Sequence, residues 1–313
     1  MRETIMDQLK RLALAAALVA LVAGGSAYAQ DGKQRGVPKP VTVPISFRFR
    51  DSSSAEMRVV DLLLREDGDI QQEVSRRTPL DSPMTLAILF QDDLVSSAAV
   101  DAKNMASYIR SQPGGSRVMV AYIRPGSLDV RRKFTNELDK AAESVRVPLS
   151  SAGAGAYNPY VEIIEGLRRF DSQPMGRRAL IVISDGIDVS RGADSSAPSQ
   201  SLDLQRAITE AQRRAVPIYS IFVPPAAPSL QPFALNGQSC LLRLSDETGG
   251  RAFFQGTAAP VSFDPFLKEI NLLMSLQLAY TYRSTHPGKG FHKLDVKPLE
   301  GNVEIRHPAG YTR

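Results

Sequence analysis

The chain has 313 residues and a formal net charge of +5, and 43% of its residues are hydrophobic and 23% charged. These values are typical of a globular protein, and the length suffices for one sizeable α/β domain with extensions. The arginines are dispersed rather than gathered in a basic stripe, so we expect no nucleic-acid partner. Cys240 is the only cysteine, which excludes a disulfide within the chain and favours a buried, inert thiol.

The first 29 residues have the pattern of a signal peptide. Lys10 and Arg11 precede an apolar run over residues 12–23, and residues 27–29 (AYA) have the small-residue pattern that signal peptidase cleaves. The alternative is an uncleaved membrane anchor, but an apolar run of about 12 residues is short for the ~20 needed to cross a bilayer. We therefore expect an exported protein, periplasmic or secreted, with no membrane span after cleavage.

The segments on either side of the central region predict β-structure. Residues 30–40 are rich in Gly, Lys and Pro and have the composition of a linker. Residues 41–80 contain an alternating strand and then two extended runs around Asp67-Gly68, a strong hairpin signal. We expect this region to be a small β lead-in to the main sheet. Residues 279–313 contain further extended runs and predict a C-terminal β-element.

Between residues 81 and 278, strand and helix patterns alternate. This alternation implies a Rossmann-like, doubly wound, mostly parallel sheet with helices on both faces. The predicted strands begin at Thr85 and cover residues 117–123, 128–134 (an edge strand), 179–184 and 216–223. The predicted helices cover residues 98–110, 136–145, a segment ending near Phe170, 203–214, 239–248 and 263–278.

Polar loops follow two of the buried strands. The strand that begins at Thr85 runs into QDDLVSS, and the strand over 179–184 runs into SDGID. Because open α/β sheets bind ligands at the carboxyl ends of their strands, we expect these loops and the small-residue loop over 150–160 to form one site for a cation or a partner protein. The candidate partner-binding residues are Asp92, Asp93, Ser96, Ser97, Asn158, Asp185 and Asp188.

Two roles remain open for these side chains. Carboxylates and hydroxyls from several loops can ligate a hard cation. Alternatively, Asp185 and Asp188 cap the following turn and Ser96 or Ser97 caps a helix. Catalysis has no positive support, because no nucleophile elbow and no glycine-rich phosphate loop is present. His286 and His292 lie on either side of a Pro-Gly turn, and this position favours surface residues of a hairpin over ligands.

Several pieces of the sequence together resemble the von Willebrand factor A-type (VWA) domain, and more closely the exported bacterial proteins called acidobacterial VWFA-related. The matching pieces occur in order and include EDGDIQQEV, LAILFQDD, GSRVMVAYI, RRALIVISDGIDVS, LSDETGGRAFF and HPAGY. The resemblance covers most of residues 60–313. It implies the doubly wound fold and a non-catalytic, protein-binding role, often through a metal-ion-dependent adhesion site.

That site is degenerate in this sequence. In the family, an Asp-x-Ser-x-Ser loop, a Thr from a second loop and an Asp from a third hold a divalent cation. Here Asp185 matches the third element, and Asp92 with Ser96 matches two of the three positions of the first, but Leu94 replaces the first serine and the threonine is missing. The metal ligands implied are Asp92, Ser96 and Asp185. We expect no firmly bound cofactor; the alternative is a weakly held Mg²⁺ or Ca²⁺.

The sequence therefore supports three hypotheses. The first is an exported, non-catalytic protein-binding module of VWA type that recognises another protein at the carboxyl edge of its sheet. The second is a structural scaffold or assembly protein of the cell envelope that uses its β-extensions. The third and weakest is a serine hydrolase that uses Ser96.

Overall fold

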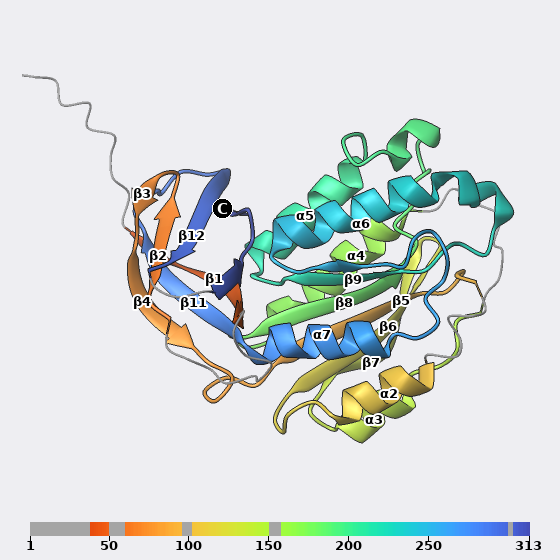
Figure 1. Cartoon of the computed structure of the whole chain (residues 1–313), viewed down its shortest axis with the longest axis horizontal. Helices are drawn as coiled ribbons and strands as arrows, with labels where there is room; N and C mark the ends of the chain where they lie inside the picture. The colour runs from red at the N-terminus through yellow and green to blue at the C-terminus, as the bar shows by residue number, and fades with distance from the viewer. Residues whose placement is uncertain (1–37, 50–59, 96–101, 150–157, 300–302) are drawn as a thin grey trace, which may run out of the picture. The chain divides into compact units, whose positions relative to one another are not determined.

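The computed structural model describes residues 38–49, 60–95, 102–149, 158–299 and 303–313 (Figure 1). The expected signal peptide and Ser96 and Ser97 lie outside these residues. Within the described part, no helix combines the length and the apolar character that crossing a bilayer requires.

A six-stranded sheet forms the centre of the α/β part, with strand order β10-β9-β8-β5-β6-β7. All neighbouring strands are parallel except β6 and β7, which pair antiparallel. The bounds are β5 Thr85–Gln91, β6 Arg117–Arg124, β7 Ser127–Thr135, β8 Arg178–Ser184, β9 Ile218–Phe222 and β10 Ala252–Phe253. Every residue of β5, β8 and β9 is buried, as expected for parallel strands that are covered on both faces.

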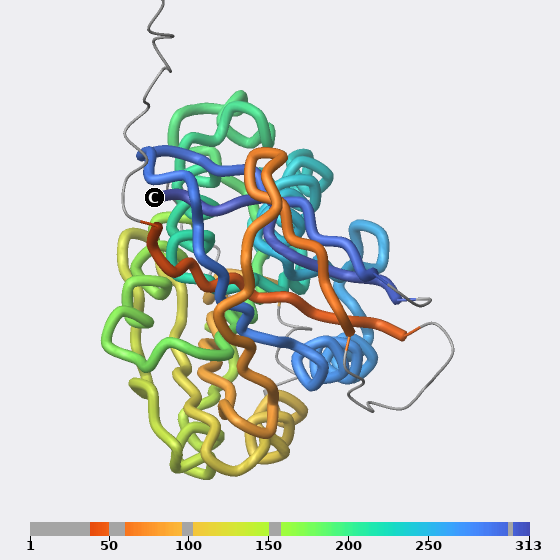
Figure 2. Tube along the Cα trace, turned by 90° about the vertical axis from the view of Figure 1, so that its left-hand side faces the viewer, coloured from red at the N-terminus to blue at the C-terminus, as the bar shows by residue number. Residues whose placement is uncertain are grey.

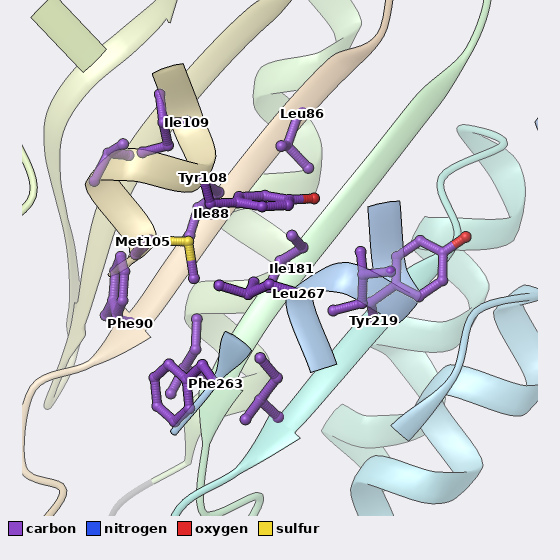
Figure 3. Close-up of a cluster of buried hydrophobic side chains, with 14 of the residues drawn as sticks. Leu86, Ile88, Phe90, Met105, Tyr108, Ile109, Ile181, Tyr219, Phe263 and Leu267 are labelled. Carbon is purple, nitrogen blue, oxygen red and sulfur yellow. The ribbon is translucent and has the colours of Figure 1, made fainter. Parts of the chain in front are cut away.

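Helices cover both faces of this sheet (Figure 1). The helix bounds are α2 Ala102–Arg110, α3 Leu138–Glu143, α4 Pro159–Arg168, α5 Leu202–Arg213, α6 Ala234–Thr248 and α7 Asp264–Ser275. Side chains of α2, α3 and α7 pack on one face of the strands, and those of α4, α5 and α6 pack on the other. Figure 3 shows the first of these layers, in which Leu86, Ile88 and Phe90 of β5 lie beside α2 and Phe263 and Leu267 lie beside the sheet. The predicted doubly wound α/β fold is confirmed.

Helix boundaries depart from the predicted ones where polar residues or proline interrupt the helical spacing of apolar residues. Helix α6 begins at Ala234, five residues before the predicted start, and follows a 3-10 segment η4, Pro228–Phe233. Helix α7 ends at Ser275, because Gln277 already begins a strand. The two other 3-10 segments are η2 Arg169–Ser172 and η3 Ala193–Ser196.

The N-terminal and C-terminal strands form two antiparallel sheets. Their orders are β13-β1-β11-β4 and β14-β12-β2-β3, and their side chains share one buried cluster. The bounds are β1 Lys39–Phe49, β2 Leu62–Glu66, β3 Asp69–Ile70, β4 Gln72–Arg77, β11 Gln277–Ser284, β12 Phe291–Pro298, β13 Val303–Arg306 and β14 Gly310–Thr312. In Figure 2 the red and orange N-terminal strands lie beside the blue C-terminal ones, which agrees with the β1–β11 and β2–β12 pairing.

This pairing corrects one expectation. The hairpin around Asp67-Gly68 is present as β2 and β3, but it is not a lead-in to the main sheet, since β1, β2 and β4 pair with the C-terminal strands instead. The sequence patterns near the N-terminus and the C-terminus predicted strands correctly but did not indicate how these strands pair. Alternation of apolar and polar residues shows that one face of a strand is buried, and it does not show which strand lies next to it.

Candidate functional site at the switch point of the sheet

The chain order changes direction between β5 and β8. From β5 the chain continues through β6 and β7 on one side, and β8, β9 and β10 build the other side. Such a switch point, at the carboxyl ends of the strands, is where open α/β sheets bind ligands. Gln91 ends β5 and Ser184 ends the adjacent β8, so the QDD and SDG loops lie side by side.

The side chain of Gln91 joins these two loops. Its Oε1 accepts hydrogen bonds from the Ser184 hydroxyl at 2.5 Å and from the Asp185 backbone N–H at 3.1 Å. Because a backbone N–H can only donate, the oxygen must face Asp185, and this fixes the orientation of the amide. The Nε2 atom then donates to Asp93 Oδ1 at 2.9 Å and to Asp185 Oδ2 at 2.8 Å. A neutral amide therefore lies between two carboxylates.

Asp185 is fully buried at the start of the turn after β8. Its Oδ1 accepts the Ile187 backbone N–H at 2.9 Å, so this carboxylate caps the turn. Burial, with a contribution from the nearby Asp93 carboxylate, raises the pKa of Asp185 to about 7. Burial also raises the pKa of Asp93. Both shifts follow from placing acids in a low-dielectric interior.

Two glycines let helix α6 approach this turn. Gly186 has a φ of +67°, and a Cβ added there would lie 2.5 Å from the Gly237 carbonyl oxygen. A Cβ added at Gly237 would lie 2.0 Å from the Asp185 carbonyl oxygen. No other residue fits either position without movement of the backbone.

Asp92 is held by the protein's own arginines. Arg146 donates from Nη1 to Asp92 Oδ1 at 2.7 Å and from Nη2 to Oδ2 at 2.6 Å, a bidentate pair. Arg124 Nε donates to Oδ2 at 3.0 Å, and the Leu149 backbone N–H donates to Oδ1 at 3.0 Å. Burial by itself would raise the pKa of Asp92, but these donors hold that pKa below its usual value.

Tyr122 positions Arg146 for this contact. The guanidinium carbon lies 3.8 Å from the centre of the Tyr122 ring, close enough for a cation–π interaction. The Tyr122 hydroxyl also accepts the Arg146 backbone N–H at 2.7 Å and donates to its carbonyl at 2.6 Å. The Asp92 carboxylate, a predicted partner-binding group, is thus paired with a cation supplied by the chain itself.

Asp188 and Asn158 serve neighbouring turns. Asp188 Oδ1 accepts from the backbone N–H and the hydroxyl of Ser190, and Oδ2 accepts from the Ser201 hydroxyl. Asn158 is the N-cap of α4, where its side-chain oxygen accepts the Tyr160 N–H at 3.0 Å. Its amide nitrogen donates to Asp203 Oδ2 at 2.7 Å.

The described residues do not fit the divalent cation of an adhesion site. Mg²⁺ requires near-ideal octahedral oxygen ligation, whereas both oxygens of Asp92 and of Asp185 accept hydrogen bonds from the protein. At Gln91 the carbonyl oxygen is occupied and the amide nitrogen cannot ligate a cation. No step is therefore assigned to a cation here.

Sequence reasoning missed the parts of this network that Gln91, Arg124 and Arg146 contribute. A signal existed for Arg124, because a charged residue ends the strand adjacent to β5. No local signal existed for Arg146, which lies 54 residues from Asp92 in sequence.

A second group of side chains could hold a metal ion. Glu66, Asp67 and His292 place one ligand atom each within 4.8 Å of one another. These residues come from the β2–β3 hairpin and from β12, away from the switch point in sequence and in sheet order.

Solved structures similar to this chain include proteins described as von Willebrand factor type A and as a VWA domain. The von Willebrand factor type A protein from Catenulispora acidiphila is 11% identical at a TM-score of 0.40, over 90% of this chain and 75% of that one. BatB from Bacteroides thetaiotaomicron is 16% identical at a TM-score of 0.39, over 61% and 97%. An aerotolerance-related membrane protein from Bacteroides fragilis is 15% identical at a TM-score of 0.39, over 62% and 98%. No protein-family model and no curated protein matches the sequence.

Proposed function

We propose that the chain is an exported, non-catalytic protein-binding module of VWA type that recognises its partner at the switch-point edge without a divalent cation. The observation that carries this proposal is the Gln91 amide, which donates to Asp93 and to Asp185. In the VWA pattern this edge binds a cation that receives a partner. Here an amide and two arginines donate to the carboxylates of this edge instead. Export rests on the signal-peptide pattern of residues 1–29.

The exposed surface beside Asp92 supplies the chemistry of recognition. Val147 is 51% exposed and Leu149 is 61% exposed, and the Arg124 side chain is 39% exposed. Apolar side chains next to a guanidinium favour a partner segment with an apolar residue and a carboxylate. This differs from the basic partner that an unoccupied acidic notch would attract, because Arg124 and Arg146 already neutralise Asp92.

Capture from the native cell envelope tests the proposal. Tagged full chain, Leu149→Asp and Arg124→Glu are compared, each with and without chelator, and bound proteins are identified by mass spectrometry. We expect one partner that persists in chelator and falls roughly tenfold with either substitution, since a hot-spot residue contributes about 1.4 kcal/mol or more. Leu80→Asp is the control, because Leu80 is 94% exposed and precedes β5 at the opposite end of the strand.

Two outcomes contradict the proposal. Capture that disappears in chelator means that a cation mediates recognition. Capture that is unchanged in Leu149→Asp and Arg124→Glu means that the partner binds elsewhere.

The scaffold alternative uses the β-extensions to pair with neighbouring molecules. Within the described residues these strands pair with each other, β1 with β11 and β2 with β12, which leaves fewer free edges for it. For the hydrolase alternative, Ser96 lies outside the described residues, and His292 contacts Asp67 in the antiparallel part. Ester or peptide turnover that disappears with Ser96→Ala would support the hydrolase.

A further inference from the structure

We propose that Glu66, Asp67, His286 and His292 form a binding site for a transition-metal ion of the zinc class, which clamps the β2–β3 hairpin to the C-terminal strands. The site is separate from the switch-point edge and does not depend on the function proposed for it. Its two acids lie more than 200 residues from its two histidines in sequence, and β2–β12 pairing brings the two pairs together.

The hairpin turn fixes the position of Asp67. Asp67 and Gly68 have φ values of +50° and +95°, which are typical of a two-residue hairpin turn. The Asp67 backbone N–H donates to Lys293 O at 2.9 Å, and the Lys293 N–H donates to Asp67 Oδ1 at 2.8 Å. These bonds leave Asp67 Oδ2 facing His292 Nδ1 at 2.8 Å.

Glu66 supplies a buried carboxylate oxygen without a hydrogen-bond donor. The residue is fully buried. Its Oε1 accepts from the Ser284 hydroxyl at 2.9 Å and from the Tyr311 hydroxyl at 2.7 Å, whereas Oε2 has no donor. Two further side chains neighbour this carboxylate. His286 Nδ1 lies 3.8 Å from Oε2, beyond hydrogen-bond length, and the buried Tyr282 hydroxyl interacts with Glu66 but makes no hydrogen bond within normal length. A buried acceptor without a partner is costly in a folded protein and points to a ligand.

The ring of His292 is oriented as a metal ligand. Its Nε2 lies 3.0 Å from the Gly288 carbonyl oxygen, so Nε2 must carry the proton. In the neutral ring, the Nδ1 lone pair then faces Asp67 Oδ2 and also Glu66 Oε1, which is 3.6 Å away. Three electron-rich atoms that face one another need either a proton on Nδ1 or a metal cation between them. A backbone carbonyl that accepts from the second ring nitrogen is usual for histidines that bind metals.

The separations between these atoms agree with ligands on one ion. Tetrahedral zinc bonds of about 2.0–2.1 Å place neighbouring ligand atoms ~3.3 Å apart. The contacts from His292 Nδ1 to Asp67 and Glu66 are 2.8 and 3.6 Å, and His286 Nδ1 lies 3.8 Å from Glu66. Imidazole nitrogens favour zinc, copper or nickel, whereas Mg²⁺ and Ca²⁺ favour oxygen ligands alone.

Surrounding polar groups hold the ligands in place. The hydroxyls of Ser284 and Tyr311 orient Glu66, and Asp69 Oδ2 lies 3.3 Å from the second ring nitrogen of His286. The Tyr311 ring also stacks on His292, with centroids 5.1 Å apart. The competing arrangement is a protonated His292 that forms an ion pair with Asp67, and the experiment distinguishes it.

Calorimetric titration of the chelator-treated full chain with Zn²⁺ tests the site. We expect one zinc per chain with submicromolar affinity, and a melting temperature that rises when zinc is added. His292→Gln and His286→Gln should each weaken binding roughly tenfold or more, and Tyr311→Phe should weaken it by about tenfold through Glu66. His307→Gln is the matched control, because His307 Nδ1 contacts the Pro308 carbonyl oxygen at 2.8 Å and His307 is not part of this cluster.

The proposal is overturned if the wild-type chain binds no zinc in the micromolar range, or if both histidine variants bind as the wild type does. Either result leaves the His292–Asp67 ion pair as the sole role of the cluster. Circular dichroism of the metal-free variants checks folding. If His292→Gln unfolds, His286→Gln decides the question, because the His286 side chain is 25% exposed and its replacement disturbs the core less.

Discussion

The amide nitrogen of Gln91 donates to Asp185 Oδ2 across the junction of β5 and β8, at a distance of 2.8 Å. This contact connects the two loops that the VWA pattern uses to hold a cation. A neutral donor satisfies both acids without adding positive charge. Burial raises the pKa of Asp185 and of Asp93, and the hydrogen bonds from Gln91 oppose this rise only in part. The positive charge at this edge comes instead from Arg124 and Arg146 on Asp92.

Loss of Arg146 should destabilise the fold. Arg146→Ala leaves the Asp92 carboxylate buried without its bidentate partner. We expect the free energy of unfolding to fall by about 1–3 kcal/mol. This loss is smaller than for a fully buried pair, because the Arg146 side chain is 22% exposed and solvent screens the interaction. Urea unfolding at neutral pH measures this change.

Arg110→Ala provides the control. Its ion pair with Asp139 is solvent-exposed on both sides, at 46% and 82%, so the substitution should change stability by less than about 0.5 kcal/mol. Equal effects of the two substitutions would show that the Asp92 network has no special structural role.

The buried Asp185 should make stability fall as pH rises from about 4 to 7. In that range the folded protein retains a proton at Asp185 that the unfolded chain has released, because burial raises the folded-state pKa to about 7. The folded state therefore binds more protons, and the free energy of unfolding decreases with pH by roughly 1.4 kcal/mol per unit at most. Above pH 7 this contribution is constant.

Urea unfolding at a series of pH values, for the wild type and Asp185→Asn, isolates the contribution. The decrease between pH 4 and 7 should be smaller in the variant, which keeps only the contribution from the raised pKa of Asp93. A difference between the two proteins that does not vary with pH would show that Asp185 titrates in its ordinary range.

The sequence predicted the class of fold and the meeting of the polar loops, and it could not predict their contacts. Apolar runs such as that of β8 report burial on both faces, and chain order then places the loop after Gln91 beside the loop after Ser184. The pairing of Asp92 with Arg146 depends on side chains 54 residues apart, and no periodic pattern encodes it. For the same reason the sequence predicts surface positions for His286 and His292, whereas His292 is buried in the structure. Their acidic neighbours come from the distant β2–β3 hairpin.

Gly237 should tolerate no side chain. A Cβ there would lie 2.0 Å from the Asp185 carbonyl oxygen, so Gly237→Ala must displace α6 or the turn after β8. We expect a loss of about 2–4 kcal/mol in the free energy of unfolding, in spite of the higher helix propensity of alanine. Thermal unfolding checks this against Gly114→Ala, where an added Cβ meets nothing within 4 Å. Similar melting temperatures for both variants would contradict the close contact.

Cys240 should be inert in the folded protein. Its thiol is buried and donates to the Ser196 carbonyl oxygen at 3.3 Å, and burial raises the pKa of Cys240 to about 11. Because the thiolate is the reactive form, a thiol reagent should label the native chain far more slowly than the urea-unfolded chain at neutral pH. Equal labelling rates would show that α6 opens readily.

Titration of the chelator-treated chain with Mg²⁺ and Ca²⁺, compared with Gln91→Asp, tests cation-independent binding at the switch point most directly. The wild type should show no micromolar affinity for either ion, because the protein's own donors occupy its carboxylates. Gln91→Asp removes the bridging amide, adds a third carboxylate, and should gain stability only when the divalent ion is added. Micromolar binding of Mg²⁺ or Ca²⁺ by the wild type, abolished by Asp185→Ala, would contradict the account.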